Sequence, residues 1–329
     1  MQYTTIKGYS GLGALGMLAL FLTAGVFLGA LIQTVIGMQM VPEGTPFSTL
    51  PNEIIKAMKD PKNIGLLRTA QVLGTLTMLF IPALLYNWLV NGGSWFWLGF
   101  NKYITVTQIA IGFGIIFIAN ILAAPLAELS KSIVANFHSL NTMAKQMEAA
   151  YNEQVILLSN LKNWGDWALA IIIMAFFPAV FEEVFFRGAM QNLFEKWWKH
   201  PMAAIIVSSV IFSIIHFSVY LFISRVILGF VLGLMYYKTR NTWVNIVAHF
   251  LNNAIAVSQL FYLNRNGGIS DPNAIEPDVP MWVGLPALAI LVGLFILLQK
   301  YSAIQREKII VKEQLLIAEA DPFSSITKK

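Results

Sequence analysis

The sequence predicts an all-α membrane protein, a polytopic bundle of about eight transmembrane helices with an amphipathic helical segment outside the membrane. Two features of the composition lead to this prediction. Hydrophobic residues make up 57% of the 329-residue chain and charged residues only 12%, whereas soluble domains are about 25% charged. The apolar residues also fall in separate runs of roughly 20, the length with which an α-helix crosses a bilayer.

The predicted spans follow the apolar runs in order. The fifth run is short for a span, but Pro201 can begin a new helix there, because proline is tolerated in the first turn of a helix. The predicted spans cover residues 9–37, 69–90, 104–126, 164–190, 202–217, 219–238, 242–262 and 281–300.

Two stretches between the spans are long enough to form structure of their own. Residues 127–163 contain no proline and space their apolar residues as a helix does, which predicts an amphipathic helical hairpin over the bundle. Residues 42–68 contain a shorter amphipathic piece, NEIIKAMKD. The chain after the last span reads as a helical tail.

The charges indicate orientation and exclude some partners. Lys and Arg lie in the turns near residues 199 and 239 and in the tail. The positive-inside rule therefore predicts a multi-pass protein of the cell membrane with both termini in the cytoplasm. The basic loop 38–68 opposes this assignment. The net charge of +5 fits contact with the lipid bilayer, and no basic run with interleaved aromatic residues indicates nucleic-acid binding. Cysteine is absent, which excludes a thiol nucleophile.

Polar and ionisable residues gather in the spans of the second half of the chain. Charges at membrane depth are costly and usually mark a functional site. The candidate residues are Glu182, Glu183, Arg187, Phe212, His216, Arg225, Asn245, His249, Asn252 and Asn253. The first three spans contain nothing comparable and are predicted to be scaffold.

Helical spacing predicts which of these side chains meet. Glu183 and Arg187 are four residues apart and can form an ion pair, whereas Glu182 points about 100° away from that face. Asn245, His249 and Asn253 form one stripe along the seventh span. Counted from the turn before Pro201, Glu182 and His216 lie at similar depth, roughly 25 Å in. The sequence therefore predicts one intramembrane cavity for these groups.

Such a cavity suits the hydrolysis of an acyl or peptide bond. A carboxylate beside an imidazole can take a proton from water, and imidazole and amide N–H groups can stabilise an oxyanion. No metalloprotease H-E-x-x-H motif is present. We therefore expect no cofactor, with zinc held by two His and a Glu as the alternative.

The motifs EEVFFR (182–187), FSIIH (212–216) and HFLNN (249–253), in this order on successive spans, resemble the CAAX-protease and bacteriocin-processing family of intramembrane endopeptidases. The resemblance implies a catalytic membrane core over 164–262. It leaves 1–163 as N-terminal spans and amphipathic helices that serve as scaffold, and 263–329 as the last span and a cytoplasmic tail.

The resemblance also implies roles for the residues. Glu182 would be the general base that activates water, and His216 would help to orient that water. His249 and Asn253 would stabilise the oxyanion. Glu183 would support the site, and Arg187 would neutralise the carboxylates. Phe212, Asn245 and Asn252 are expected to be supporting residues.

Three classes of function remain open. The first is an endopeptidase that cleaves a membrane-associated protein or peptide. The second is a bacteriocin-immunity or scaffold protein of the same family that does not require catalysis. The third is an ion- or proton-coupled transporter, because buried carboxylates and histidines also form relays; the apolar first three spans disfavour it. No pattern in the sequence specifies the oligomeric state.

Overall fold

The computed structural model describes residues 3–158, 161, 163–265 and 279–320, and its regular structure is helical, which confirms the predicted all-α bundle. Within the described residues, β pairing is limited to one bridge between Thr4 and Ser10. The elements in order are α1 Gly11–Met38, α2 Leu50–Met58, η1 Pro61–Asn63, α3 Ile64–Thr75, η2 Leu76–Phe80, α4 Ile81–Asn91, η3 Trp95–Leu98, α5 Val106–Ala135, α6 His138–Leu158, α7 Trp164–Ala170, η4 Ile171–Phe176, α8 Phe177–Glu183, η5 Val184–Gln191, α9 Asn192–Trp198, α10 Pro201–Ile214, α11 Phe222–Thr239, α12 Thr242–Arg265, η7 Met281–Val283 and α13 Gly284–Ala320.

Seven helices of the described chain are long and apolar enough to cross a membrane, not about eight. The difference is the fifth predicted span, 202–217, because α10 ends at Ile214. The chain then turns through Phe217, a non-glycine residue with a positive φ of 49°. His216 therefore lies on a connection between α10 and α11 and not on a helix.

Local sequence signals explain where several helices begin and end. Thr105 and Gln108 form a capping box at the start of α5. Pro201 begins α10, as its position predicts. Lys199 and Arg240 end α9 and α11 in the left-handed conformation, which lets the chain reverse between consecutive helices.

Two prolines explain wide turns in otherwise continuous helices. Pro82 and Pro178 lie at the starts of α4 and α8, directly after the π-helical stretches η2 and η4. Proline cannot donate the usual helical hydrogen bond, so the preceding turn widens. A third π-helical stretch, η5, follows Glu183 without a proline, and π turns are frequent at functional sites.

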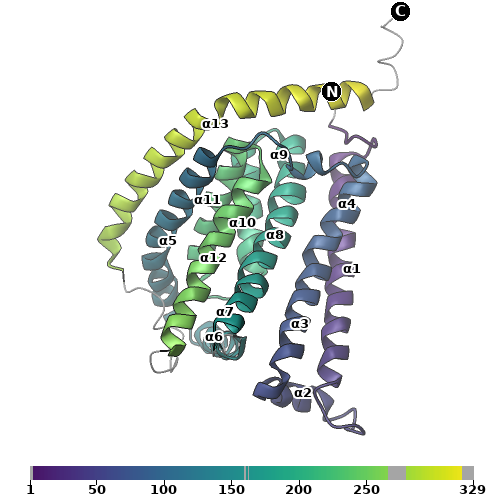
Figure 1. Ribbon diagram of the computed structural model, residues 1–329, viewed down its shortest axis with the longest axis vertical. Coiled ribbons are helices and arrows are strands. Elements are labelled where there is room, and N and C mark those ends of the chain that lie inside the picture. The colour runs from purple at the N-terminus through teal and green to yellow at the C-terminus, as the bar shows by residue number, and fades with distance from the viewer. Residues whose placement is uncertain (1–2, 159–160, 162, 266–278, 321–329) are drawn as a thin grey trace, which may run out of the picture.

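The helices pack as two groups joined through the α8–α9 helix (Figure 1). Helices α1, α3 and α4 lie on one side, and their core continues into Phe185 and Phe186 of η5. On the other side α5, α11, α12 and α13 share a second core. Gly229 and Gly233 provide the close packing that their spacing predicts: a Cβ on Gly229 would lie 3.2 Å from the Ser209 backbone.

The segments outside the predicted spans are helical in part. The predicted piece NEIIKAMKD lies in α2 up to Met58, and its last two residues follow the helix. The expected hairpin over 127–163 consists of the end of α5, which continues to Ala135, and of α6. The last span and the tail form one helix, α13, which runs along the bundle and then across one end (Figure 1). Residues 321–329 lie outside the described residues.

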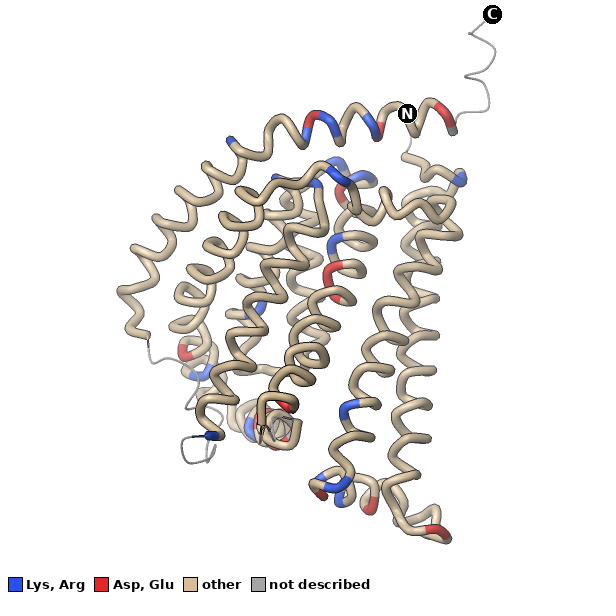
Figure 2. Tube along the Cα trace, in the orientation of Figure 1, with Lys and Arg blue, Asp and Glu red and all other residues tan. Residues whose placement is uncertain are grey.

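Charged residues concentrate near the two ends of the bundle (Figure 2). The beginning of α1 and the end of α13 lie at the same end (Figure 1). An even number of passes places both ends of a chain on the same side. Seven long spans and the shorter apolar helix α10 together give such a number.

Candidate active site

The two adjacent glutamates lie in the middle of the long helix that runs from Trp164 to Trp198. Glu183 ends α8, and the π-helical turn of η5 begins at the next residue. The Glu182 side chain is 12% exposed, and the Glu183 side chain is fully buried. Their side chains point in different directions, so each carboxylate has its own set of neighbours.

Glu183 is held by one ion pair and two hydrogen bonds. Its Oε1 lies 3.2 Å from Arg187 Nη1 and accepts a hydrogen bond from His249 Nδ1 at 3.0 Å. Its Oε2 accepts from Asn245 Nδ2 at 3.1 Å. The Glu183–Arg187 ion pair is the one that the four-residue spacing predicts. A buried carboxylate is costly unless it is paired in this way, so the four side chains form a single network.

The network is anchored to the backbone of α11. Arg187 Nη2 donates to Gly229 O at 3.1 Å, and Asn245 Nδ2 also donates to Leu232 O at 2.7 Å. The Arg187 guanidinium lies 5.0 Å from the centre of the Phe212 ring. Phe212 therefore supports the site as a cation–π and packing partner.

Glu182 faces two imidazoles. Its Oε2 lies 3.9 Å from His216 Nε2 and 4.0 Å from His249 Nε2, and it has no hydrogen-bond partner. The other nitrogen of each ring is already engaged: His216 Nδ1 donates to Phe212 O at 2.6 Å, and His249 Nδ1 donates to Glu183. In the neutral rings both Nε2 atoms are thus acceptors.

Three acceptor atoms that converge without a donor form a site for a polarised water. A water about 2.8 Å from each of two acceptors can span the 3.9 and 4.0 Å separations without strain. The arrangement can therefore bind water, orient it and take its proton. This convergence joins residues of α8, of the α10–α11 connection and of α12.

The same atoms are the donor types that zinc prefers, so the set fits that ion chemically. Two ligands about 2.0 Å from a tetrahedral zinc would lie roughly 3.3 Å apart, closer than the distances from Glu182 Oε2 to the two Nε2 atoms. Among the described residues no group of three His, Cys, Asp or Glu has a metal-ligating arrangement. Zinc would require the carboxylate and both rings to move together.

Asn253 and Asn252 lie one helical turn beyond His249 on α12. Asn252 Nδ2 donates to Asn253 Oδ1 at 3.3 Å, and Asn252 Oδ1 also accepts from Asn120 of α5. Asn253 contacts Asn252 through this hydrogen bond, and no hydrogen bond among the described residues joins Asn253 to Glu182. The structure therefore groups Asn252 and Asn253 beside the carboxylate site and not in direct contact with it.

Sequence patterns missed most of the residues that hold the His216 connection. Arg225, one of the candidate residues, donates from Nη1 to His216 O at 3.2 Å. Two residues of α6 hold the same connection: Glu148 accepts from Ser218, and Asn141 accepts from Tyr220. The two contacts with α6 join residues 70 and 79 positions apart, so helical spacing could not have found them.

Comparisons with known proteins converge on the segment that carries these side chains. Residues 164–255 match the family model described as "Type II CAAX prenyl endopeptidase Rce1-like". The uncharacterized protein YpbD of Bacillus subtilis (strain 168) is 34% identical over 94 residues, which cover 27% of this chain and 45% of YpbD. The match therefore spans less than half of that relative. No solved structure gives a significant match. The resemblance to the CAAX protease family is thus confirmed for residues 164–255.

Proposed function

We propose that this protein is an intramembrane endopeptidase that hydrolyses a peptide bond of a membrane-associated substrate, on the premise that residues 164–255 are similar to type II CAAX prenyl endopeptidases. The observation that carries the proposal is the convergence of Glu182 Oε2 with His216 Nε2 and His249 Nε2. Glu182 and His216 can accept the two hydrogen bonds of one water, and His249 lies beside the same carboxylate. The protein would act in the cell membrane with both termini in the cytoplasm.

Glu182 is the general base of the proposed reaction. Its carboxylate takes one proton from the water, and His216 Nε2 accepts a hydrogen bond from the other hydrogen and so orients the attacking oxygen. The water oxygen bonds to the carbonyl carbon of the scissile peptide. When the tetrahedral intermediate collapses, the C–N bond breaks and the leaving amine takes the proton from Glu182. The products are a carboxylic acid and an amine, and transfer of the acid's proton to the amine gives the carboxylate and the ammonium ion.

His249 stabilises the oxyanion in this mechanism. The Glu183 carboxylate, 3.0 Å from His249 Nδ1, favours a positive charge on that ring. Protonated His249 can then donate Nε2–H to the developing negative oxygen. Glu183 and Asn245 are positioning residues, because Glu183 contacts His249 and Asn245 contacts Glu183, and neither contacts the reacting atoms. Asn253 would reach the oxyanion only after its amide turns away from Asn252.

Purified full-length protein and a quenched peptide library test this proposal. We expect the wild type to cleave, and both Glu182→Gln and His249→Ala to lose cleavage by at least about a hundredfold. Glu53→Gln, which removes an exposed carboxylate on α2, is the matched control and should cleave normally. Activity that survives a chelator supports the metal-free reaction.

Other outcomes assign the site differently. Loss of cleavage with chelator and its return with zinc would place Glu182, His216 and His249 in a metal site. If folded wild-type protein cleaved no peptide of a library that a related protease cuts, the endopeptidase proposal would fail. The immunity or scaffold function would then be favoured.

A further inference from the structure

The connection that carries His216 runs over residues 215–221, between α10 and α11, and is not itself helical. Its two ends are joined, because Ser213 of α10 donates from Oγ to Phe222 O of α11 at 2.8 Å. Residues outside a helix lack the repeating backbone hydrogen bonds of that helix and need partners from elsewhere. The place of the His216 ring beside Glu182 therefore depends on the elements that hold this connection.

Helix α6 holds the connection with two hydrogen bonds from one of its faces. Asn141 Oδ1 accepts from Tyr220 Oη at 2.6 Å, and Glu148 Oε2 accepts from Ser218 Oγ at 3.1 Å. The two acceptors are about two helical turns apart, so they lie on the same face of α6. Ser218 and Tyr220 are 6% and 9% exposed, and a buried hydroxyl without an acceptor is costly. The two bonds thus fix the chain just beyond His216.

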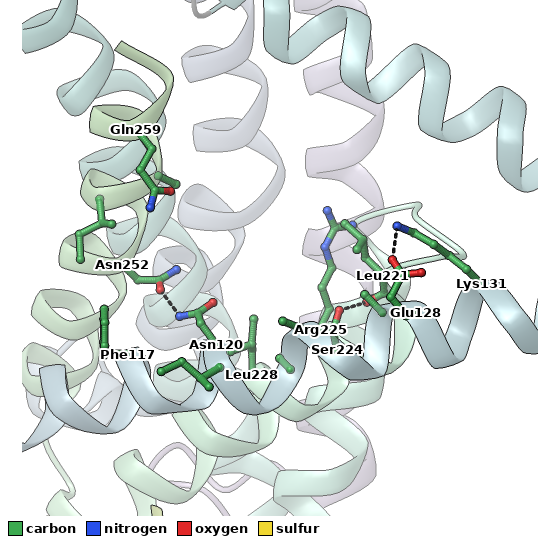
Figure 3. Close-up of a pocket in the computed structure, with 16 residues that line it drawn as sticks. Phe117, Asn120, Glu128, Lys131, Leu221, Ser224, Arg225, Leu228, Asn252 and Gln259 are labelled. Carbon is green, nitrogen blue, oxygen red and sulfur yellow. Dashed lines mark hydrogen bonds and ion pairs between the residues drawn. The ribbon is translucent and has the colours of Figure 1, made fainter. Parts of the chain in front are cut away.

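A third contact from α6 reaches the connection through Arg225 at the start of α11. Arg225 Nη1 donates to His216 O at 3.2 Å, and its guanidinium lies 5.4 Å from the centre of the Tyr151 ring of α6. Arg225 also lines a cavity of about 780 Å³ between α5, α11 and α12, where Figure 3 shows it beside the Glu128–Lys131 pair of α5. The carbonyl of His216 is thus held by a side chain that α6 supports through a cation–π contact.

Apolar packing between α6 and the connection is incomplete. Val134 of α5, Ala144 of α6 and Tyr220 form a small core. Val134 also lines a cavity of about 380 Å³ between α5, α6 and the connection, together with apolar side chains that include Met143 and Phe217. Side chains that border a cavity lose the contacts of a closely packed core. The hydrogen bonds to α6 therefore determine the position of the connection more than the apolar contacts do.

The other end of α6 is fixed to the N-terminal helices. Arg68 of α3 is 6% exposed and donates from Nη2 to Leu158 O at 3.1 Å. Leu158 also packs in a core with Leu67 of α3. Lys59, which follows α2, pairs with Glu153 at 2.7 Å, but this pair is about half exposed and such pairs contribute little. Helix α6 is thus anchored on α3 and reaches from there to the His216 connection.

We propose that α6 positions the His216 ring for the hydrolytic step, with Asn141 and Glu148 as positioning residues and α3 as the anchor. The inference rests on the proposed function and gives the N-terminal helices a part in the reaction. His216 Nε2 lies 3.9 Å from Glu182 Oε2, a separation that one water can span. A displacement of about 1 Å would take the water out of reach of one acceptor, and such a displacement can lower a rate about a hundredfold.

Peptide cleavage by purified full-length variants in detergent tests the effect on the reaction. Tyr220→Phe removes the hydroxyl that Asn141 accepts, and Glu148→Ala removes the acceptor of Ser218. We expect the double variant to lower kcat by about tenfold or more, with KM within about twofold of the wild type. Glu148→Gln keeps an acceptor and should retain most of the turnover. Gln146→Ala, on the exposed opposite face of α6, is the matched control and should leave kcat unchanged.

The ring signals of His216 provide a second measurement, which does not require cleavage. The chain contains 4 histidines, so histidine-selective isotope labelling gives a simple NMR spectrum in which His216→Gln identifies the signals of that ring. We expect the double variant Tyr220→Phe with Glu148→Ala to shift or broaden these signals and to leave those of His200 in place. Gln146→Ala should change neither set.

Unchanged His216 signals in the double variant would overturn the proposal, even if kcat fell. Equal changes in the signals of His200 and His216, with a lower melting temperature, would also overturn it and reduce α6 to a general support of the bundle. If the wild type cleaved no peptide, the proposed function would fail, and the ring signals by themselves would decide whether α6 positions His216.

Discussion

The helix from Trp164 to Trp198 carries two buried acidic clusters that look alike by composition and differ in what surrounds them. In the first, Glu183 is paired with Arg187, His249 and Asn245. In the second, Glu195 is paired with Arg240 at 2.8 Å and with Gln191 at 2.8 Å. Each carboxylate is desolvated and compensated by an arginine, which is what burial of a charge requires.

The neighbouring residue distinguishes the clusters. Beside Glu195, Lys196 forms an ion pair with Glu313 of α13 at 2.7 Å. Burial by itself would lower the pKa of the Arg240 guanidinium, but the Glu195 carboxylate raises that pKa above its ordinary value. The two ion pairs of this cluster join α9 to the α11–α12 turn and to α13. Beside Glu183, Glu182 has no hydrogen-bond partner and faces two imidazoles. The second cluster therefore contains ion pairs between helices, whereas the first adds a carboxylate that faces two imidazoles.

The largest expected effect is on cleavage by Glu182→Gln. Loss of a general base lowers the rate by about 10²–10⁴-fold. The melting temperature should stay the same or rise, because the substitution removes a charge that has no hydrogen-bond partner in the folded protein. Peptide cleavage and thermal unfolding in detergent measure the two quantities. A loss of both activity and stability would make Glu182 a structural residue like Glu183.

Glu183→Gln should instead destabilise the protein by about 3–5 kcal/mol, because Arg187 would remain buried without its carboxylate. Cleavage should also fall, since His249 loses the acceptor that orients it. Adding Arg187→Met should recover most of the stability and little of the cleavage. If both stability and cleavage recovered, Glu183 would act only through its ion pair with Arg187. If neither recovered, the network of Glu183, Arg187, His249 and Asn245 would be contradicted.

Glu195→Gln should lower stability by about 1.5–3 kcal/mol, a smaller loss because Arg240 retains partial exposure to water. The protein that remains folded should cleave peptide at nearly the wild-type rate. This variant is the sharpest test of the comparison, since it removes an equally buried carboxylate from the same helix. A specific loss of turnover with normal melting would show that the second cluster also serves the reaction.

The smallest effect is expected for Glu313→Gln. The Lys196–Glu313 pair is about a quarter exposed on both sides, and pairs of this kind contribute less than about 1 kcal/mol. The melting temperature of the wild type should differ slightly between low and high salt, and Glu313→Gln should remove this difference. A loss of several kcal/mol would instead assign the α13 tail a main role in holding the bundle.

Much of the architecture follows from the sequence because hydropathy and helical period act locally. The apolar runs predict the spans, and the four-residue spacing predicts the Glu183–Arg187 pair. The end of α10 was not predicted, because the run continues apolar through Phe217 while the helix stops at Ile214. Contacts with Glu148 of α6, 70 residues before Ser218, and with Arg225 of the next helix hold the turn that follows α10.

The candidate site divides in the same way. Sequence by itself determined the all-helical class, the order of the motifs and the choice of Glu182, His216 and His249 as a group, because charges at membrane depth are too costly to retain without a role. Tertiary structure decided that Glu183 is committed to three donors, that Glu182 faces both rings, and that Asn253 contacts Asn252 rather than Glu182. It also decided that Arg225 lines a cavity with Asn120 of a span that appeared to be scaffold. These outcomes depend on how neighbouring helices are rotated and how deep each lies, and packing between distant segments sets both.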